Sequence, residues 1–153
     1  MKFFRTDAQA ALNSLLVTAR ETLDHYRDAA ELVEPKLAEA FKNISRLRRD
    51  FIGALENAVR ESGDLPAVPD PDKEAGAMLL HHVVAAIKDD YAGDLISQRI
   101  EAEQTLLEQL AEAKVIELNA AQKLLMDELS EHVSQTIQHL QTLQTQIPTR
   151  ENA

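Results

Sequence analysis

The chain contains no cysteine, and it has only four glycines and five prolines among its 153 residues. Without a thiol, disulfides, thiolate metal sites and a cysteine nucleophile are all excluded. No apolar stretch approaches the roughly 20 residues that a membrane-spanning helix needs. The first seven residues, from Met1 to Asp7, also mix charges into the region where a signal peptide needs an apolar run. We therefore expect a cytoplasmic protein that does not enter the membrane.

Basic residues are outnumbered, with 16 Lys and Arg against 26 Asp and Glu, so the formal net charge is −10. Such an acidic chain is poorly suited to neutralising phosphates, which is the dominant source of affinity for nucleic acids. Anionic membrane surfaces are disfavoured for the same electrostatic reason. We expect neither nucleic acid nor membrane among the partners.

What the chain does have is a high content of Ala, Leu, Glu and Gln with apolar residues at helical spacing, which predicts an all-α fold. Thr6 and Gln9 form a capping box before a first helix over residues 7–33. Pro35 is well placed to start a second helix that ends at Gly63. A third helix is predicted from Asp94 past Leu110, and a fourth from about Glu117 to Pro148, with no good cap at its start.

The long connection between the second and third predicted helices begins with a proline-containing linker over residues 64–72. A short amphipathic helix follows over residues 74–89, and the pattern weakens at residues 89–93, where we expect a break. Two antiparallel pairs joined by this crossover predict a four-helix bundle with ferritin-like connectivity. We expect one domain over residues 1–148 and a loose tail over residues 149–153. The apolar side of residues 74–89 needs a covering surface, which favours a homodimer.

Two charged residues interrupt the predicted apolar stripes: Arg48 in the second helix and Glu103 in the third. A charge on a buried stripe is costly unless it has a partner, so we predict a direct hydrogen-bonded pair between them. The alternative is that Arg48 extends along the stripe to solvent while Glu103 forms a local cap. Tyr26 lies on the stripe of the first helix, where we expect a core tyrosine whose hydroxyl bonds a polar partner. These three residues form the predicted buried polar core.

Several of these features together resemble a bacterial ferritin-like family of unknown function, whose members are conserved hypothetical proteins of about this length. The resemblance covers roughly residues 11–143. It rests on the run Tyr26–Arg27–Asp28–Ala29–Ala30–Glu31, on the linker with its short helix, on Glu103, and on the spacing of Phe41, Arg48, Phe51 and Leu55. Leu23 stands where the family pattern usually has a glutamate in the first helix. The resemblance implies the fold and supplies no activity.

A di-iron site of the ferritin-like kind needs a Glu from each of two helices and a Glu-x-x-His motif from each of the others. The second helix has no histidine, and its Arg48 cannot ligate a metal. The metal candidates that remain are Glu103, Glu128, His132 and His139. The alternative for His132 and His139 is a hydrogen-bonded position at the edge of the helix. We expect His25 on a solvated face, and His81 and His82 at or near the surface.

No Gly-rich phosphate loop, Gly-x-Ser-x-Gly or His-Glu-x-x-His motif is present. Two hypotheses follow. The first is a non-catalytic, self-associating or partner-binding bundle, in a stress-related setting, whose core holds an Arg–Glu pair instead of metals and which needs no cofactor. The alternative is a metal-binding or di-iron-like oxidative protein with an atypical iron or manganese site near Glu103, Glu128 and His132.

Overall fold

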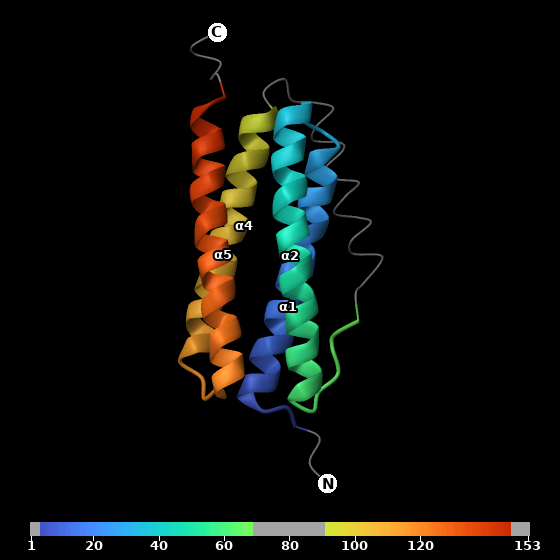
Figure 1. The fold of residues 1–153 in the computed structure, drawn as a ribbon, viewed down its shortest axis with the longest axis vertical. Helices are drawn as coiled ribbons and strands as arrows, with labels where there is room; N and C mark the ends of the chain where they lie inside the picture. Colours follow the sequence, from blue (N-terminus) through green and yellow to red (C-terminus); the bar gives the residue numbers. More distant parts are fainter. Residues whose placement is uncertain (1–3, 69–90, 148–153) are drawn as a thin grey trace.

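The computed structural model describes residues 4–68 and 91–147. It contains four helices within these ranges, and no strand occurs in them. The helices are α1 (Asp7–Ala30), α2 (Pro35–Glu61), α4 (Tyr91–Lys114) and α5 (Ala120–Thr145). They pack side by side as a four-helix bundle (Figure 1), so the predicted all-α class is confirmed for the described residues. None of these four helices is long and apolar enough to cross a membrane.

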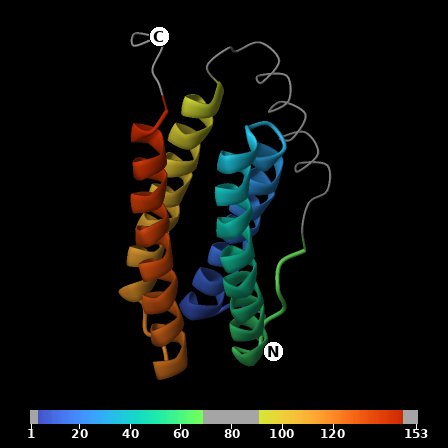
Figure 2. The same ribbon diagram turned by 45° about the horizontal axis from the view of Figure 1, so that its top comes forward.

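The two views of the bundle show how the helices run relative to one another (Figures 1 and 2). α1 and α5 point toward the end where the C-terminus lies, and α2 and α4 point the opposite way. Each of α1 and α5 packs against both α2 and α4, so every neighbouring pair of helices is antiparallel. The end of α2 and the start of α4 lie at opposite ends of the bundle, and the connection between them therefore spans its length.

The start of α1 agrees with the sequence, because Thr6 and Gln9 form the predicted capping box. The predicted end at Val33 is wrong, since the helix stops at Ala30 and residues 31–33 form a turn. The backbone at Glu34 is extended, as expected for a residue before proline. Its carboxylate caps α2 by accepting hydrogen bonds from the Lys36 and Leu37 amides. The N-cap needs this extended conformation, and the first helix has to end before it.

The other helix boundaries differ from the sequence pattern in similar small ways. α2 ends at Glu61, and Gly63 adopts a φ of 88°, a left-handed conformation that favours glycine at helix ends. α4 already begins at Tyr91, so residues 91–93 are helical rather than part of a break. α5 begins at Ala120 and has a full capping box between Asn119 and Gln122, a signal that the sequence prediction missed. The predicted short helix over residues 74–89 and the tail over residues 149–153 lie outside the described residues.

The beginning of the long connection is attached to α1 rather than leaving the bundle directly. The Asn13 side chain donates to the Asp64 carboxylate (3.2 Å) and to the Leu65 carbonyl (2.9 Å). Its carbonyl oxygen accepts a hydrogen bond from the Ala67 amide (2.8 Å). Arg20 adds a further hydrogen bond, to the Ala67 carbonyl. These contacts explain why a polar residue, Asn13, is buried on α1.

The core consists of two apolar clusters, one toward each end of the bundle. The first holds Leu12, Leu15, Leu16, Leu55, Leu106, Leu110, Met126 and Leu129 among its buried members. The second holds Tyr26, Phe41, Tyr91, Leu95, Ile96 and Leu140 among its buried members. On α4 and α5, Leu106 and Met126 are fully buried, whereas the neighbouring Leu107 and Leu125 are only partly buried. Most positions of the predicted stripes on α4 and α5 are buried as expected, including Ile96, Ile100, Leu110, Leu129, Val133 and Leu140.

Candidate functional site

Between the two apolar clusters lies a layer of buried polar side chains to which all four helices contribute. The layer comprises Thr22 and Tyr26 of α1, Arg48 of α2, Arg99 and Glu103 of α4, and His132 of α5. Arg48, Tyr26 and Glu103 have no exposed surface at all. Buried ionisable groups carry a large desolvation penalty unless hydrogen bonds and opposite charges offset it. The partners of each group in this layer therefore decide what the layer can do.

Arg48 and Glu103 form the direct pair that the stripe positions predicted. Nη1 of Arg48 donates to Oε2 of Glu103 over 3.0 Å, and Nη2 donates to Oε1. The carboxylate is thus held by both ends of the guanidinium fork, which is the strongest arrangement for such a pair. The alternative, in which Arg48 reaches solvent and Glu103 caps locally, is wrong.

The remaining sides of the Arg48 guanidinium are occupied by two neutral acceptors. Nη1 also donates to the Thr22 hydroxyl (2.7 Å), which in turn donates to the Ala19 carbonyl (2.7 Å). Nε donates to Nε2 of His132 (3.1 Å). Neither Thr22 nor the role of His132 as an acceptor followed from the sequence pattern. The one available signal for Thr22 was its position one turn before Tyr26 on α1.

His132 is held as a neutral imidazole by its surroundings. Burial and then the positive charge of Arg48 lower its pKa from 6.5 to about 4. An arginine can only donate, so Nε2 must be the acceptor and the ring proton belongs on Nδ1. The ring also stacks on Phe51, with the centroids 4.9 Å apart and the planes 23° from parallel. His132 thus serves as a fixed hydrogen-bond acceptor for the guanidinium at neutral pH.

Tyr26 is buried as predicted, but its hydroxyl does not have the expected hydrogen-bond partner. The oxygen makes no hydrogen bond of normal geometry with any described residue. Burial raises the pKa of Tyr26 well above its usual value, and the nearby Glu103 carboxylate raises it further. The carbon at the centre of the Arg48 guanidinium lies 5.9 Å from the Tyr26 ring centroid, and that of Arg99 lies 5.8 Å away. The ring therefore interacts with two cations through its π-system.

Arg99 is the buried cation that the sequence prediction missed. Only 4% of its surface is exposed, and burial lowers the pKa of its guanidinium. Its Nη2 lies 3.0 Å from Nδ1 of His25, whereas Nε and Nη1 have no hydrogen-bond partner among the described residues. His25 is half-buried rather than on a solvated face as predicted. The missed signal was spacing, because Arg99 lies one helical turn before Glu103 and so faces the same way.

The four metal candidates do not come together in the structure. Glu128 and His139 lie exposed on α5, away from the buried layer that holds Glu103 and His132. Both oxygens of Glu103 and Nε2 of His132 accept hydrogen bonds from Arg48, so a guanidinium occupies the space where a metal would need to be. Among residues 4–68 and 91–147, no three His, Asp or Glu side chains are arranged to hold a metal ion. Glu103, Glu128, His132 and His139, as they lie in the described part of the chain, do not form an iron or manganese site.

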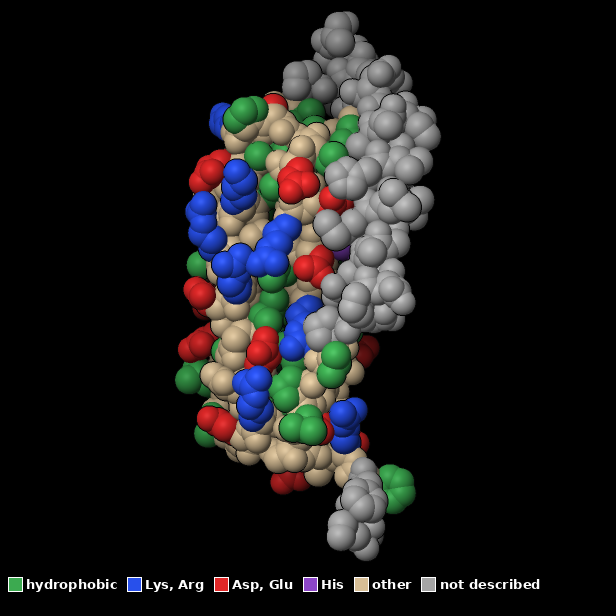
Figure 3. Space-filling model, turned by 90° about the vertical axis from the view of Figure 1, so that its right-hand side faces the viewer, with side chains coloured by type: hydrophobic (Ala, Val, Ile, Leu, Met, Phe, Trp, Pro, Cys, Tyr) green, Lys and Arg blue, Asp and Glu red, His purple; other side chains and the backbone are tan. Residues whose placement is uncertain are grey.

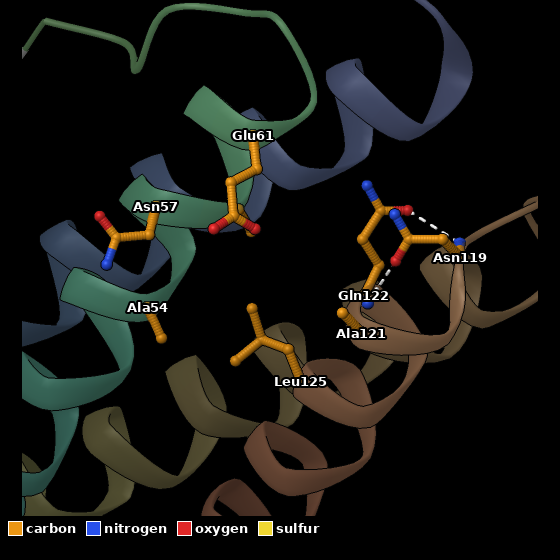
Figure 4. A pocket seen from close by; sticks show the side chains of 8 residues that line it. Ala54, Asn57, Glu61, Asn119, Ala121, Gln122 and Leu125 are labelled. Carbon is orange, nitrogen blue, oxygen red and sulfur yellow. Dashed lines mark hydrogen bonds between the residues drawn. The ribbon is translucent and has the colours of Figure 1, made fainter.

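A surface hollow of about 270 Å³ lies between the end of α2 and the start of α5 (Figure 4). Its walls are Ala54, Asn57, Ala58, Glu61, Asn119, Ala121, Gln122 and Leu125. The amides of Asn119 and Gln122 point toward the backbone of α5, where they form its capping box. Glu61 and Asn57 are therefore the polar side chains in the walls that a ligand could contact. The walls contain no nucleophilic side chain and no charged group besides Glu61. The hollow does not have the composition of a catalytic site.

A family model described as a domain of unknown function, DUF2383, matches residues 7–115 of the chain. The matched region includes Thr22, Tyr26, Arg48, Arg99 and Glu103, and it ends before α5. No curated protein and no solved structure matches the chain significantly. The chain belongs to the DUF2383 family.

Proposed function

We propose that this DUF2383 protein is a non-catalytic helical bundle of ferritin-like connectivity that acts by binding a protein surface, with a second copy of itself as the first partner. The observation that carries the proposal is the saturated contact between Arg48 and Glu103. Both oxygens of the only carboxylate in the central layer accept hydrogen bonds from one guanidinium. Nε2 of His132 also accepts from Arg48, so neither the carboxylate nor this imidazole nitrogen is available to ligate a metal.

The arrangement of the helices supports the ferritin-like part of the proposal. In ferritin-like bundles two antiparallel pairs are joined by one long crossover, so that the second and third long helices run in the same direction. α2 and α4 run in the same direction here, and their connection spans the length of the bundle (Figure 1). In such bundles the metal ligands project inward near the middle of the helices. The Arg48–Glu103 pair occupies that central region between the two apolar clusters.

The distribution of surface charge supports association. Exposed basic residues on α2 include Lys42, Arg46 and Arg49, which follow one another at helical spacing. Figure 3 shows a face of the molecule on which several Lys and Arg side chains lie among Asp and Glu side chains, although the chain is acidic overall. α4 and α5 carry more acidic than basic residues. Two copies can therefore pair a basic face with an acidic one, and opposite charges favour such an encounter.

Metal analysis tests the core of the proposal. Protein purified from cells supplemented with iron and manganese should carry substoichiometric metal, and Zn²⁺ or Mn²⁺ should leave its melting temperature unchanged. A site that binds only the folded state would instead raise the melting temperature with metal concentration. The matched control replaces His132 and His139 by Gln. A metal-dependent rise in the parent that is lost in this double variant would overturn the proposal in favour of the oxidative alternative.

Light scattering tests the association. At low salt the protein should show a mass above the 17.1 kDa of one chain, and added salt should lower that mass because it screens the charges. Replacing Lys42, Arg46 and Arg49 together by Glu should give a monomer at low salt. A mass of 17.1 kDa for the parent at every concentration would contradict self-association.

A further inference from the structure

The guanidinium of Arg99 has two sides whose donors are not used. Nη2 is bonded to His25, but Nε and Nη1 have no hydrogen-bond partner among the described residues. The side chain is more than nine-tenths buried, so bulk water does not satisfy these donors. A buried charged donor without a partner is rare in native proteins and calls for an explanation such as a bound ion or water.

The carboxylates near Arg99 do not fill this gap. Both oxygens of Glu103 accept hydrogen bonds from Arg48. Asp28 is a second buried carboxylate in this half of the bundle, but Nε and Nη1 of Arg99 make no hydrogen bond to it. The two arginines thus differ in their anionic partner, because Arg48 is matched by a carboxylate and Arg99 is hydrogen-bonded only to an imidazole.

The chemistry around the unused donors favours an anion over a water molecule. Arginine can only donate hydrogen bonds. The Tyr26 ring lies beside the Arg99 guanidinium, and the Tyr26 hydroxyl also has no hydrogen-bond partner among the described residues. A water would supply an acceptor but no charge, whereas a halide or a small carboxylate supplies acceptor capacity together with a negative charge that compensates the buried guanidinium. We propose that Arg99, with Tyr26 beside it, binds a small monovalent anion such as chloride or formate.

The proposal is independent of the proposed function, because it concerns Arg99 and not the Arg48–Glu103 contact. The test is thermal unfolding at pH 7 and constant ionic strength, with chloride replacing a bulky sulfonate buffer anion that the buried site cannot admit. The melting temperature of the parent should rise with chloride concentration by mass action. Formate should act in the same way. Arg99→Met should abolish the rise, and Arg99→Lys should weaken the apparent affinity by about tenfold or more, since the lysine ammonium lacks the planar fork.

The matched control is Arg49→Met, which removes an exposed arginine and should keep the chloride dependence of the parent. The proposal would be overturned if chloride raised the melting temperature of Arg99→Met as much as that of the parent, or if it did not raise the melting temperature of the parent at all. A crystal structure of the parent grown with bromide covers the case in which the Arg99 variants do not fold. An anomalous peak beside Nε or Nη1 of Arg99 is the expected result. Full occupancy of that position by water, with no anomalous signal, would show that no anion binds there.

Discussion

Arg48 and Arg99 are two arginines buried in the same polar layer, and their surroundings differ sharply. Arg48 donates to a carboxylate, a hydroxyl and an imidazole, so every nitrogen of its guanidinium has a partner. Arg99 has one hydrogen bond, to His25, and its Nε and Nη1 have no hydrogen-bond partner among the described residues. Both guanidiniums lie near the same ring, that of Tyr26. Similar burial of the same residue type has therefore produced one saturated site and one with unused donors.

A buried charge has different consequences according to its partners. Arg48 holds α1, α2, α4 and α5 together through Thr22, Glu103 and His132, and its hydrogen bonds fix how the four helices meet. Such a saturated pair contributes little net stability compared with an apolar core, but the loss of one partner is costly. Arg99 connects only α4 and α1. Its unused donors make it a binding position rather than a structural one.

The largest expected effect concerns the saturated pair. Arg48→Met alone or Glu103→Leu alone should lower the free energy of unfolding by about 3–5 kcal/mol, because each strands the other charge in the core. The double variant should lose far less, since two apolar side chains replace both charges. Urea unfolding of the parent, both single variants and the double variant measures the coupling. Additive single effects would show that the two side chains do not act as a pair.

The next effect concerns His132 and depends on pH. The folded pKa of about 4 lies below the unfolded value of 6.5, so the unfolded chain takes up this proton first as the pH falls. The stabilisation that comes from this pKa difference is fully present above about pH 6.5. As the pH falls toward 4, the free energy of unfolding decreases by up to about 1.4 kcal/mol per pH unit. His132→Gln should remove this pH dependence of the free energy of unfolding. The amide oxygen of the introduced glutamine can still accept a hydrogen bond from Arg48. Urea unfolding across this pH range measures the slope, with exposed His139→Gln as the control. An unchanged slope in His132→Gln would contradict the assignment.

The smallest effect concerns the other arginine. Arg99→Met should change the free energy of unfolding by no more than about 1 kcal/mol in buffer without small anions, because the lost group had two unmet donors and one neutral partner. The same urea experiment measures it beside Arg48→Met. A loss as large as that of Arg48→Met would remove the contrast between the two sites and show that Arg99 is also structural.

The sequence alone was sufficient for the features that depend on local order. The capping box of Thr6 and Gln9, the start of α2 at Pro35 and the four long helices all follow from spacing and residue type within one segment. The Arg48–Glu103 contact was also within reach, because a charge in the middle of an apolar stripe needs an opposite charge. These predictions required only the helical period and the cost of burying a charge.

Other features depended on how the helices rotate and meet. Leu106 rather than Leu107 faces the core, His132 accepts from Arg48 while Glu128 lies exposed, and Arg99 contacts His25. A helical pattern fixes a face only to within about a residue, and it contains no information about which side chain of a neighbouring helix lies opposite. Local sequence was therefore enough to identify the four helices, the capping box of Thr6 and Gln9, and a charged pair in the core. Only the packing of the four helices decided which donors found partners, because hydrogen bonds require positions that are set across helices rather than along one.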